Sequence, residues 1–172
     1  STGLDALTQV LEPYVSVAAN PITDTLCREG LWRGAESLLK AFKNGNDAEA
    51  REDMALVSLL GGLALANAKL GAVHGFAGVL GGMYDAPHGA ICGRLLPYVM
   101  ETNVAALAAR EPTNPALGRY GEVASILSGD FDATAADGVT WVSDLCQELA
   151  VPGLAAYGVS RGHFAEIVEK TQ

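Results

Sequence analysis

The sequence predicts an all-α fold, a bundle of several helices, and two observations support this class. Apolar residues recur three or four positions apart along nearly the whole chain, which is the period of an amphipathic helix. No segment alternates apolar and polar residues convincingly, as a half-buried strand would. The chain has 172 residues, enough for one domain that buries roughly 70% of its unfolded surface. We therefore expect residues 1–172 to form a single helical domain.

The first two helices are placed by their apolar faces and their starting residues. Residues 3–12 already have an amphipathic pattern. A second helix is expected to begin at Pro21, because Asn20 can cap the first turn and proline suits the first helical position. Gly45 can end this helix. Its predicted apolar face consists of Ile22, Leu26, Leu31, Ala35, Leu38, Leu39 and Phe42.

A third helix is expected over residues 47–69. Asn46 and Glu49 have the spacing of a capping box at its start. From Met54 to Ala66 the segment is apolar nearly all round, so we expect this helix to be the central, fully buried one. A short apolar helix that carries His74 follows.

The second half of the chain is divided by its prolines. Pro87 can open a helix, and Pro97 inside the same apolar run predicts a kink. The last helix is expected to begin at a Ser160 cap. Further helices are expected at 116–128, 134–149 and 160–171, after a loop at 110–115, and Phe164, Ile167 and Val168 are the expected packing residues of the last one.

Composition and charge exclude several partners. The chain is 49% hydrophobic and 18% charged, which indicates a globular protein, and its net charge is −9. Nucleic acid and anionic membrane surfaces attract cationic patches, so neither is an expected partner. The longest apolar stretch, Met54 to Ala68, is too short to cross a bilayer, which takes about 20 residues.

Cys27, Cys92 and Cys146 are an odd number of cysteines at wide spacing, without a CxxC pair. A disulfide framework is therefore not expected. Free thiols in a reducing compartment fit better, and we expect a cytoplasmic location.

Two of the three histidines, His74 and His88, bracket a glycine-rich segment. Neutral imidazole is the commonest protein metal ligand, and glycine allows close approach. Asp5 and Gln9 lie four residues apart, so they share one helix face and could meet this pair. The alternatives are that His74 is a core histidine, that His88 caps a helix, that Asp5 favours a helix N-terminus, and that Gln9 is solvated.

Three segments resemble the iron-containing alcohol dehydrogenases. They are GLDALTQVLE at residues 3–12, the long run AREDMALVSLLGGLALANAKLGAVHGFAGVLGGMYDAPHGAICGRLLPYVMETN at residues 50–103, and LAVPGLAAYGVSRGHFAEIVEKT at residues 149–171. Maleylacetate reductases belong to the same superfamily, and dehydroquinate synthase is a more distant relative. The resemblance covers essentially the whole chain, and its central motif is long and specific.

The resemblance implies two domains in the complete enzyme: an α/β domain that binds NAD(P), and a helical domain that holds a divalent metal. This chain resembles the helical domain only, and no GxGxxG turn occurs in its sequence. We expect the metal-binding half of an NAD(P)-dependent alcohol dehydrogenase or carbonyl reductase, inactive alone. A helix pattern already at residue 3 and a final helix that stops at Gln172 suggest a piece of a longer protein.

The resemblance also implies the ligands. The family holds its metal with one Asp and three His, which fall on Asp5, Gln9, His74 and His88. Gln9 offers a neutral oxygen where the family has an imidazole, so weaker binding of Fe²⁺ or Zn²⁺, or a different or absent metal, is expected. A further family His near the substrate falls on Gly78, which removes a titratable group and leaves room for a bulkier substrate.

Other residues near the histidines have two interpretations. Phe76, Met83 and Tyr84 are candidates for a substrate wall, but aromatic and Met side chains more often serve core packing. Asp85 could orient His88, or it could be a turn residue. No catalytic residue is assigned within this chain.

A competing hypothesis is a stand-alone helical binding or oligomerisation module that has lost metal and catalysis. A domain that lacks a partner domain exposes apolar surface, which self-association can cover. A homodimer is the simplest result. In the first hypothesis, the partner is instead a small-molecule alcohol or carbonyl substrate of the complete enzyme.

Overall fold

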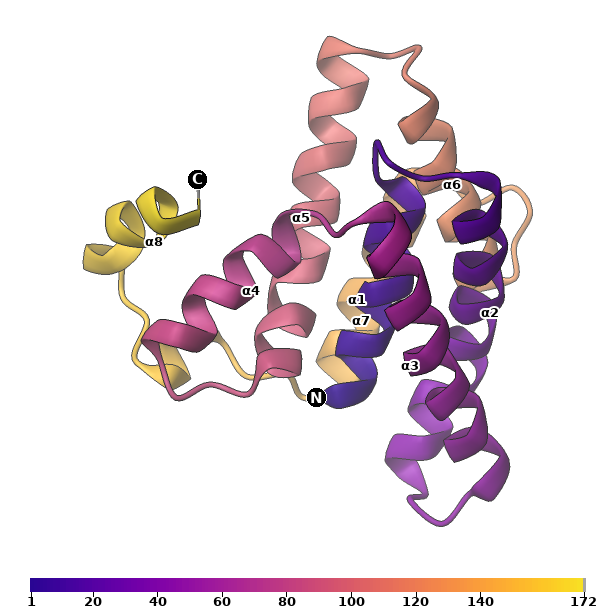
Figure 1. The fold of residues 1–172 in the computed structure, drawn as a ribbon, viewed down its shortest axis with the longest axis horizontal. Coiled ribbons are helices and arrows are strands. Elements are labelled where there is room, and N and C mark those ends of the chain that lie inside the picture. Colours follow the sequence, from indigo (N-terminus) through magenta and orange to yellow (C-terminus); the bar gives the residue numbers. More distant parts are fainter. Residues whose placement is uncertain (172) are drawn as a thin grey trace.

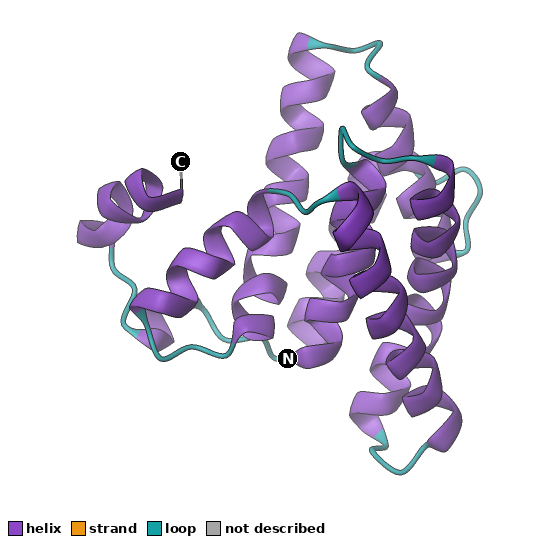
Figure 2. Cartoon of the chain, in the orientation of Figure 1, coloured by secondary structure: helices purple, strands orange, loops and turns teal. Residues whose placement is uncertain are grey.

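Helices make up most of the computed structural model, which describes residues 1–171 (Figures 1 and 2). No strand occurs in this part of the chain, so the expected all-α class is confirmed. The elements are α1 (Thr2–Val15), α2 (Pro21–Lys43), α3 (Ala48–Ala68), α4 (Ala72–Met83), α5 (His88–Arg110), α6 (Pro115–Ser128), α7 (Ala135–Glu148), the short 3-10 turns η1 (Leu154–Tyr157) and η2 (Arg161–His163), and α8 (Phe164–Thr171).

The starts of α2 and α3 show how local sequence sets the helix ends. The Asn20 side chain accepts hydrogen bonds from the backbone N–H groups of Ile22 and Thr23, as the Asn-Pro pair predicts. The predicted cap of the next helix is wrong by one residue. Asp47, not Asn46, accepts from the Ala50 N–H at 3.0 Å, because an ionised carboxylate is the stronger acceptor at a helix N-terminus.

The central helix is α1, which lies between the α2–α3 pair and α5 (Figure 1). Nine of its fourteen residues are buried, including Leu7 and Val10. The expectation that α3 is fully buried is wrong, since Leu59 and Leu63 are 59% and 46% exposed. α3 packs on α1 and α2 with one face only, so the all-round apolar pattern does not indicate burial here.

Several residues of the predicted apolar faces are exposed. Ile22 and Phe42 stand near the two ends of α2, a helix of 23 residues packed on the 14-residue α1, so its ends extend past the core. The final segment begins as η2 and becomes α-helical only at Phe164. Ile167 is buried there, whereas Phe164 and Val168 are exposed because α8 packs mainly on α4.

α5 continues as one helix through Pro97. Whether Pro97 kinks it stays a prediction. No single helix within residues 1–171 is long and apolar enough to cross a membrane, although α3 and α4, bent by 104° at their junction, pass that test together on length and composition.

Two close approaches at glycines bring the start of α5 against α1. A Cβ added at Gly93 of α5 would lie 2.5 Å from the Leu4 side chain of α1, and one at Gly89 would lie 2.3 Å from the Ser1 carbonyl oxygen. These glycines let the first turns of α5 lie directly against the start of α1. The sharp α3–α4 turn includes Lys69 at φ 63°, ψ −178°, a conformation that strongly favours glycine. This turn directs α4 across α5, so that His74 faces α1.

Candidate metal centre

One face of α1 supplies three polar side chains to a small buried region. Asp5, Gln9 and Glu12 follow one another at spacings of four and three residues, so they lie along the same side of the helix. The Asp5 side chain is 24% exposed, whereas that of Glu12 is 5% exposed. This side of α1 faces the start of α4 and the start of α5.

His74, in the first turn of α4, connects two of these carboxylates. Its Nδ1 lies 2.7 Å from Glu12 Oε2, and its Nε2 lies 3.1 Å from Asp5 Oδ1. Glu12 also accepts a hydrogen bond from the Val73 N–H at 2.8 Å. Since an ionised carboxylate only accepts hydrogen bonds, Glu12 keeps a proton on Nδ1 and aims Nε2 at Asp5.

The first turns of α5 complete the group with His88 and Cys92, one helical turn apart. His88 Nε2 lies 3.7 Å from Asp5 Oδ1, and the His88 ring is 5.5 Å from the His74 ring, centroid to centroid. Cys92 is buried, and its Sγ lies 3.9 Å from His74 Nε2. His88 is 46% exposed, so the group is open to solvent on this side.

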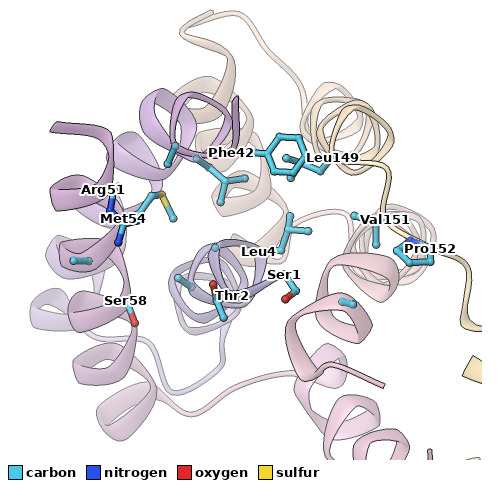
Figure 3. Close-up of a pocket in the computed structure, with 16 residues that line it drawn as sticks. Ser1, Thr2, Leu4, Phe42, Arg51, Met54, Ser58, Leu149, Val151 and Pro152 are labelled. Carbon is cyan, nitrogen blue, oxygen red and sulfur yellow. The ribbon is translucent and has the colours of Figure 1, made fainter. Parts of the chain in front are cut away.

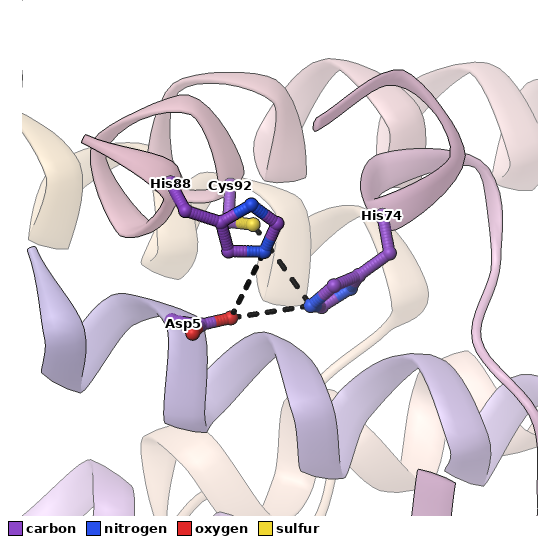
Figure 4. A group of neighbouring side chains, drawn as sticks. All are labelled: Asp5, His74, His88 and Cys92. Carbon is purple, nitrogen blue, oxygen red and sulfur yellow. Dashed lines mark hydrogen bonds and ion pairs between the residues drawn. The ribbon is translucent and has the colours of Figure 1, made fainter. Parts of the chain in front are cut away.

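Asp5, His74, His88 and Cys92 thus point toward one common region (Figure 4), with one ligand atom of each within 4.8 Å of the others. One oxygen, two imidazole nitrogens and one sulfur form a donor set that suits borderline divalent cations such as Fe²⁺ and Zn²⁺. The residues therefore fit a divalent metal of the kind predicted from the sequence.

Gln9 lies next to this group, but its amide is turned toward Asp5. The Gln9 Nε2 donates a hydrogen bond to Asp5 Oδ1 at 3.1 Å. Its side-chain oxygen lies on the side of Gly61 in α3. In this arrangement Gln9 orients the carboxylate of Asp5.

His74 and Asp5 shift each other's pKa values toward the charged forms. Burial of His74 opposes protonation, but hydrogen bonds to Asp5, Cys92 and Glu12 outweigh it and raise the His74 pKa to about 11. The hydrogen bond from His74 lowers the pKa of Asp5 against the opposing effect of its burial. Without a metal, a positive charge on His74 therefore takes the place of a cation between the carboxylates.

Glu12 and Cys92 were not identified from the sequence. Each carries a weak signal: Glu12 lies on the same helix face as Asp5, and Cys92 lies one turn after His88. Their burial beside His74 is visible only in the structure, where three helices meet.

The other residues singled out near the histidines have simpler positions. Phe76, Met83 and Tyr84 are partly buried and pack against the core, in agreement with the packing interpretation. Asp85 is exposed at the bend after α4 and makes no hydrogen bond to His88 in the described part of the chain, so the turn interpretation holds. Gly78 is exposed, with nothing within 4 Å of an added Cβ.

A pocket of about 460 Å³ lies beside the start of α1 (Figure 3). Its wall includes Leu4, Phe42, Met54 and Leu149, contributed by α1, α2, α3 and the segment after α7. None of the four clustered residues lines it. It is a mainly apolar hollow separate from the candidate metal centre.

The fold and the cluster together define a helical domain with a candidate metal centre between its helices. Residues 1–172 match the Fe-containing alcohol dehydrogenase family, C-terminal part. The chain belongs to this family.

The chain is similar to several known members. It is 40% identical over 170 residues to alcohol dehydrogenase 4 of Schizosaccharomyces pombe, which covers 98% of the chain and 38% of that protein. It is 34% identical over 175 residues to 1,3-propanediol dehydrogenase of Klebsiella pneumoniae, covering 98% of the chain and 43% of that protein. The solved alcohol dehydrogenase from Oenococcus oeni superposes with a TM-score of 0.86 at 37% identity, covering 99% of this chain and 44% of that one. The chain therefore spans less than half the length of these relatives.

Proposed function

We propose that this chain is the helical, metal-holding part of an alcohol dehydrogenase or carbonyl reductase that uses NAD(P). The observation that carries the proposal is the convergence of Asp5, His74 and His88, from three helices, with ligand atoms within 4.8 Å of one another. Membership of the iron-containing alcohol dehydrogenase family supports Fe²⁺ or Zn²⁺ as the metal. The domain alone is expected to be inactive, with NAD(P) bound by another part of the complete enzyme.

In this proposal Asp5, His74 and His88 hold the metal. A bound divalent cation would supply Lewis-acid polarisation of an alcohol or carbonyl oxygen. Glu12 fixes the orientation of His74, and the Gln9 amide fixes that of Asp5.

The substrate is proposed to be a small alcohol or carbonyl compound that enters on the exposed side of His88. His88 is 46% exposed and so leaves one side of the centre open, as a catalytic metal site requires. Gly78, exposed and one turn after His74, adds room along α4.

Calorimetric titration of the metal-free chain with Zn²⁺, Fe²⁺, Mn²⁺ and Ni²⁺ tests this proposal. Binding of at least one ion is expected, with affinity reduced at least about tenfold in His88→Ala. His163→Ala is the matched control, because His163 contacts Ser160 and Tyr84 and lies outside the cluster. Failure of all four ions to bind at sub-millimolar concentration would overturn the proposal.

A second candidate function is a binding or oligomerisation module without metal. The observation in its favour is a groove of about 1090 Å³ in which Trp32 and Phe131 are 52% and 96% exposed. Aromatic side chains exposed together favour a partner surface, here a homodimer. Sedimentation of the chain and of Trp32→Ser tests this: a dimer that Trp32→Ser dissociates, in a chain that binds no metal, would favour the second candidate.

We also propose a cytoplasmic location. The three cysteines are buried free thiols, which fits a reducing compartment. Localisation of the tagged full-length protein by microscopy tests this, and secretion into the medium would contradict it.

A further inference from the structure

We propose that the Cys92 thiolate is a ligand of the same metal, which makes the centre an Asp5–His74–His88–Cys92 site. This inference rests on the proposed function, since it names a further ligand at that site. It replaces the expectation that Gln9 supplies the fourth ligand atom. The Gln9 amide N–H donates to Asp5, so in this arrangement Gln9 orients a ligand.

Three of the six separations between the four ligand atoms are close to those expected between ligands of one cation at tetrahedral angles. Zinc bound to nitrogen or oxygen at about 2.0–2.1 Å and to sulfur at about 2.3 Å separates nitrogen from oxygen by about 3.3 Å and nitrogen from sulfur by about 3.6 Å. The corresponding separations here are 3.1 Å for Asp5 Oδ1 to His74 Nε2, 3.7 Å for Asp5 Oδ1 to His88 Nε2, and 3.9 Å for Cys92 Sγ to His74 Nε2. The three remaining pairs lie within 4.8 Å of each other. The four atoms can therefore face one ion from the protein side, and the exposed side of His88 is left for a fifth ligand such as the substrate.

Cys92 also differs from Cys146 in what its sulfur contacts. The Cys146 thiol donates a hydrogen bond to the Gly93 carbonyl at 3.1 Å, so its sulfur is used in packing α7 on α5. Cys92 Sγ, in contrast, contacts His74 Nε2, the nitrogen that faces Asp5. It is fully buried and lies one helical turn from His88, so both project from the same side of α5.

A sulfur ligand changes which ion the centre prefers. Binding releases the thiol proton of Cys92 to solvent, with no change in oxidation state. A thiolate favours Zn²⁺, Co²⁺ and Fe²⁺ over oxygen-preferring ions such as Mg²⁺. Sulfur in the donor set thus compensates for the absence of a third imidazole.

Two spectroscopic measurements on the full chain test the assignment. X-ray absorption of the Zn²⁺-loaded protein should show one sulfur at about 2.3 Å besides a nitrogen and oxygen shell. The Co²⁺-loaded protein should show a sulfur-to-metal charge-transfer band in the near ultraviolet. Both signals should persist in Cys146→Ser, the matched buried cysteine, and disappear in Cys92→Ser, with affinity for Zn²⁺ lowered at least about tenfold.

The outcomes separate this inference from the proposed function. A shell of nitrogen and oxygen only, with unchanged affinity in Cys92→Ser, would overturn the cysteine ligand and leave the metal centre in place. Absence of binding in the unaltered chain would overturn both. Because the absorption spectrum is recorded on the unaltered chain, the result stands even if Cys92→Ser fails to fold.

Discussion

Replacing Glu12 by Gln tests how the candidate centre is organised. The buried Glu12 carboxylate accepts three hydrogen bonds. One comes from the His74 backbone N–H at 3.4 Å, and the two shortest come from the Val73 N–H and from His74 Nδ1, at 2.8 and 2.7 Å. An amide has one oxygen for these two donors, so in either orientation its NH₂ group faces a donor. The substitution preserves shape and removes only the charge and one acceptor.

The expected cost follows from those two contacts. A buried donor left without its acceptor costs about 1–3 kcal/mol, and a hydrogen bond to a charged group contributes about 1.5–3 kcal/mol. We expect the free energy of unfolding to fall by about 2–3 kcal/mol, which for a domain of this size lowers the melting temperature by roughly 4–12 °C. In the orientation that places the new NH₂ group against Nδ1, the imidazole proton would shift to Nε2, the nitrogen that faces the metal, and metal affinity would fall about 10–100-fold.

Thermal unfolding of the metal-free chain and calorimetric titration with Zn²⁺ measure the two effects. Glu148→Gln is the matched control, because it removes the same charge from an exposed ion pair with Lys43 and should cost at most about 1 kcal/mol. If Glu12→Gln has the same melting temperature as the control and binds Zn²⁺ with unchanged affinity, then Glu12 does not orient His74.

Further predictions concern the backbone, the packing and the pH dependence. Lys69→Gly should stabilise the chain by up to about 1 kcal/mol in denaturant unfolding, because glycine adopts the positive φ at the α3–α4 turn without strain. A loss of stability would show that Lys69 is not strained there. Gly93→Ala should cost about 1–3 kcal/mol, since the new methyl group would meet Leu4 at 2.5 Å, whereas Gly121→Ala, with nothing within 4 Å, should stabilise by about 0.5–1 kcal/mol. Equal effects of the two would refute the close helix contact. The pKa of His74 is raised from 6.5 to about 11, so its stabilisation of the metal-free chain is complete below pH 6.5 and is lost as the pH rises toward 11. His74→Gln should flatten this alkaline loss in urea titrations at several pH values, and an unchanged profile would show that His74 is not protonated between the carboxylates.

The helices follow from short-range sequence features. Asn20 followed by Pro21 starts α2 in the structure as the pair predicts, because a cap depends on residues within one turn. The placement of Asp5 and Gln9 on one helix face is likewise a local property. The capping box at residue 46 failed because Asp47, its neighbour, is an equally local competitor.

Burial is not a local property. α3 is apolar nearly all round from Met54 to Ala66, yet Leu59 is exposed and α1 is central, because a helix is buried only by what packs around it. An apolar pattern shows which surface can be buried, and the arrangement of the other helices decides whether it is.

The candidate centre divides in the same way. His74, His88 and Asp5 can be identified in the sequence as residue types that bind metals, and the family resemblance groups them as ligands of one metal. The roles of Glu12 and Cys92 required the tertiary structure, since Glu12 meets Val73 across 61 residues of chain and Cys92 meets the ring of His74 from a different helix. Residue chemistry and helical periodicity act within a few positions and are readable from the sequence, whereas the distance between two side chains on different helices is set by how the whole bundle packs.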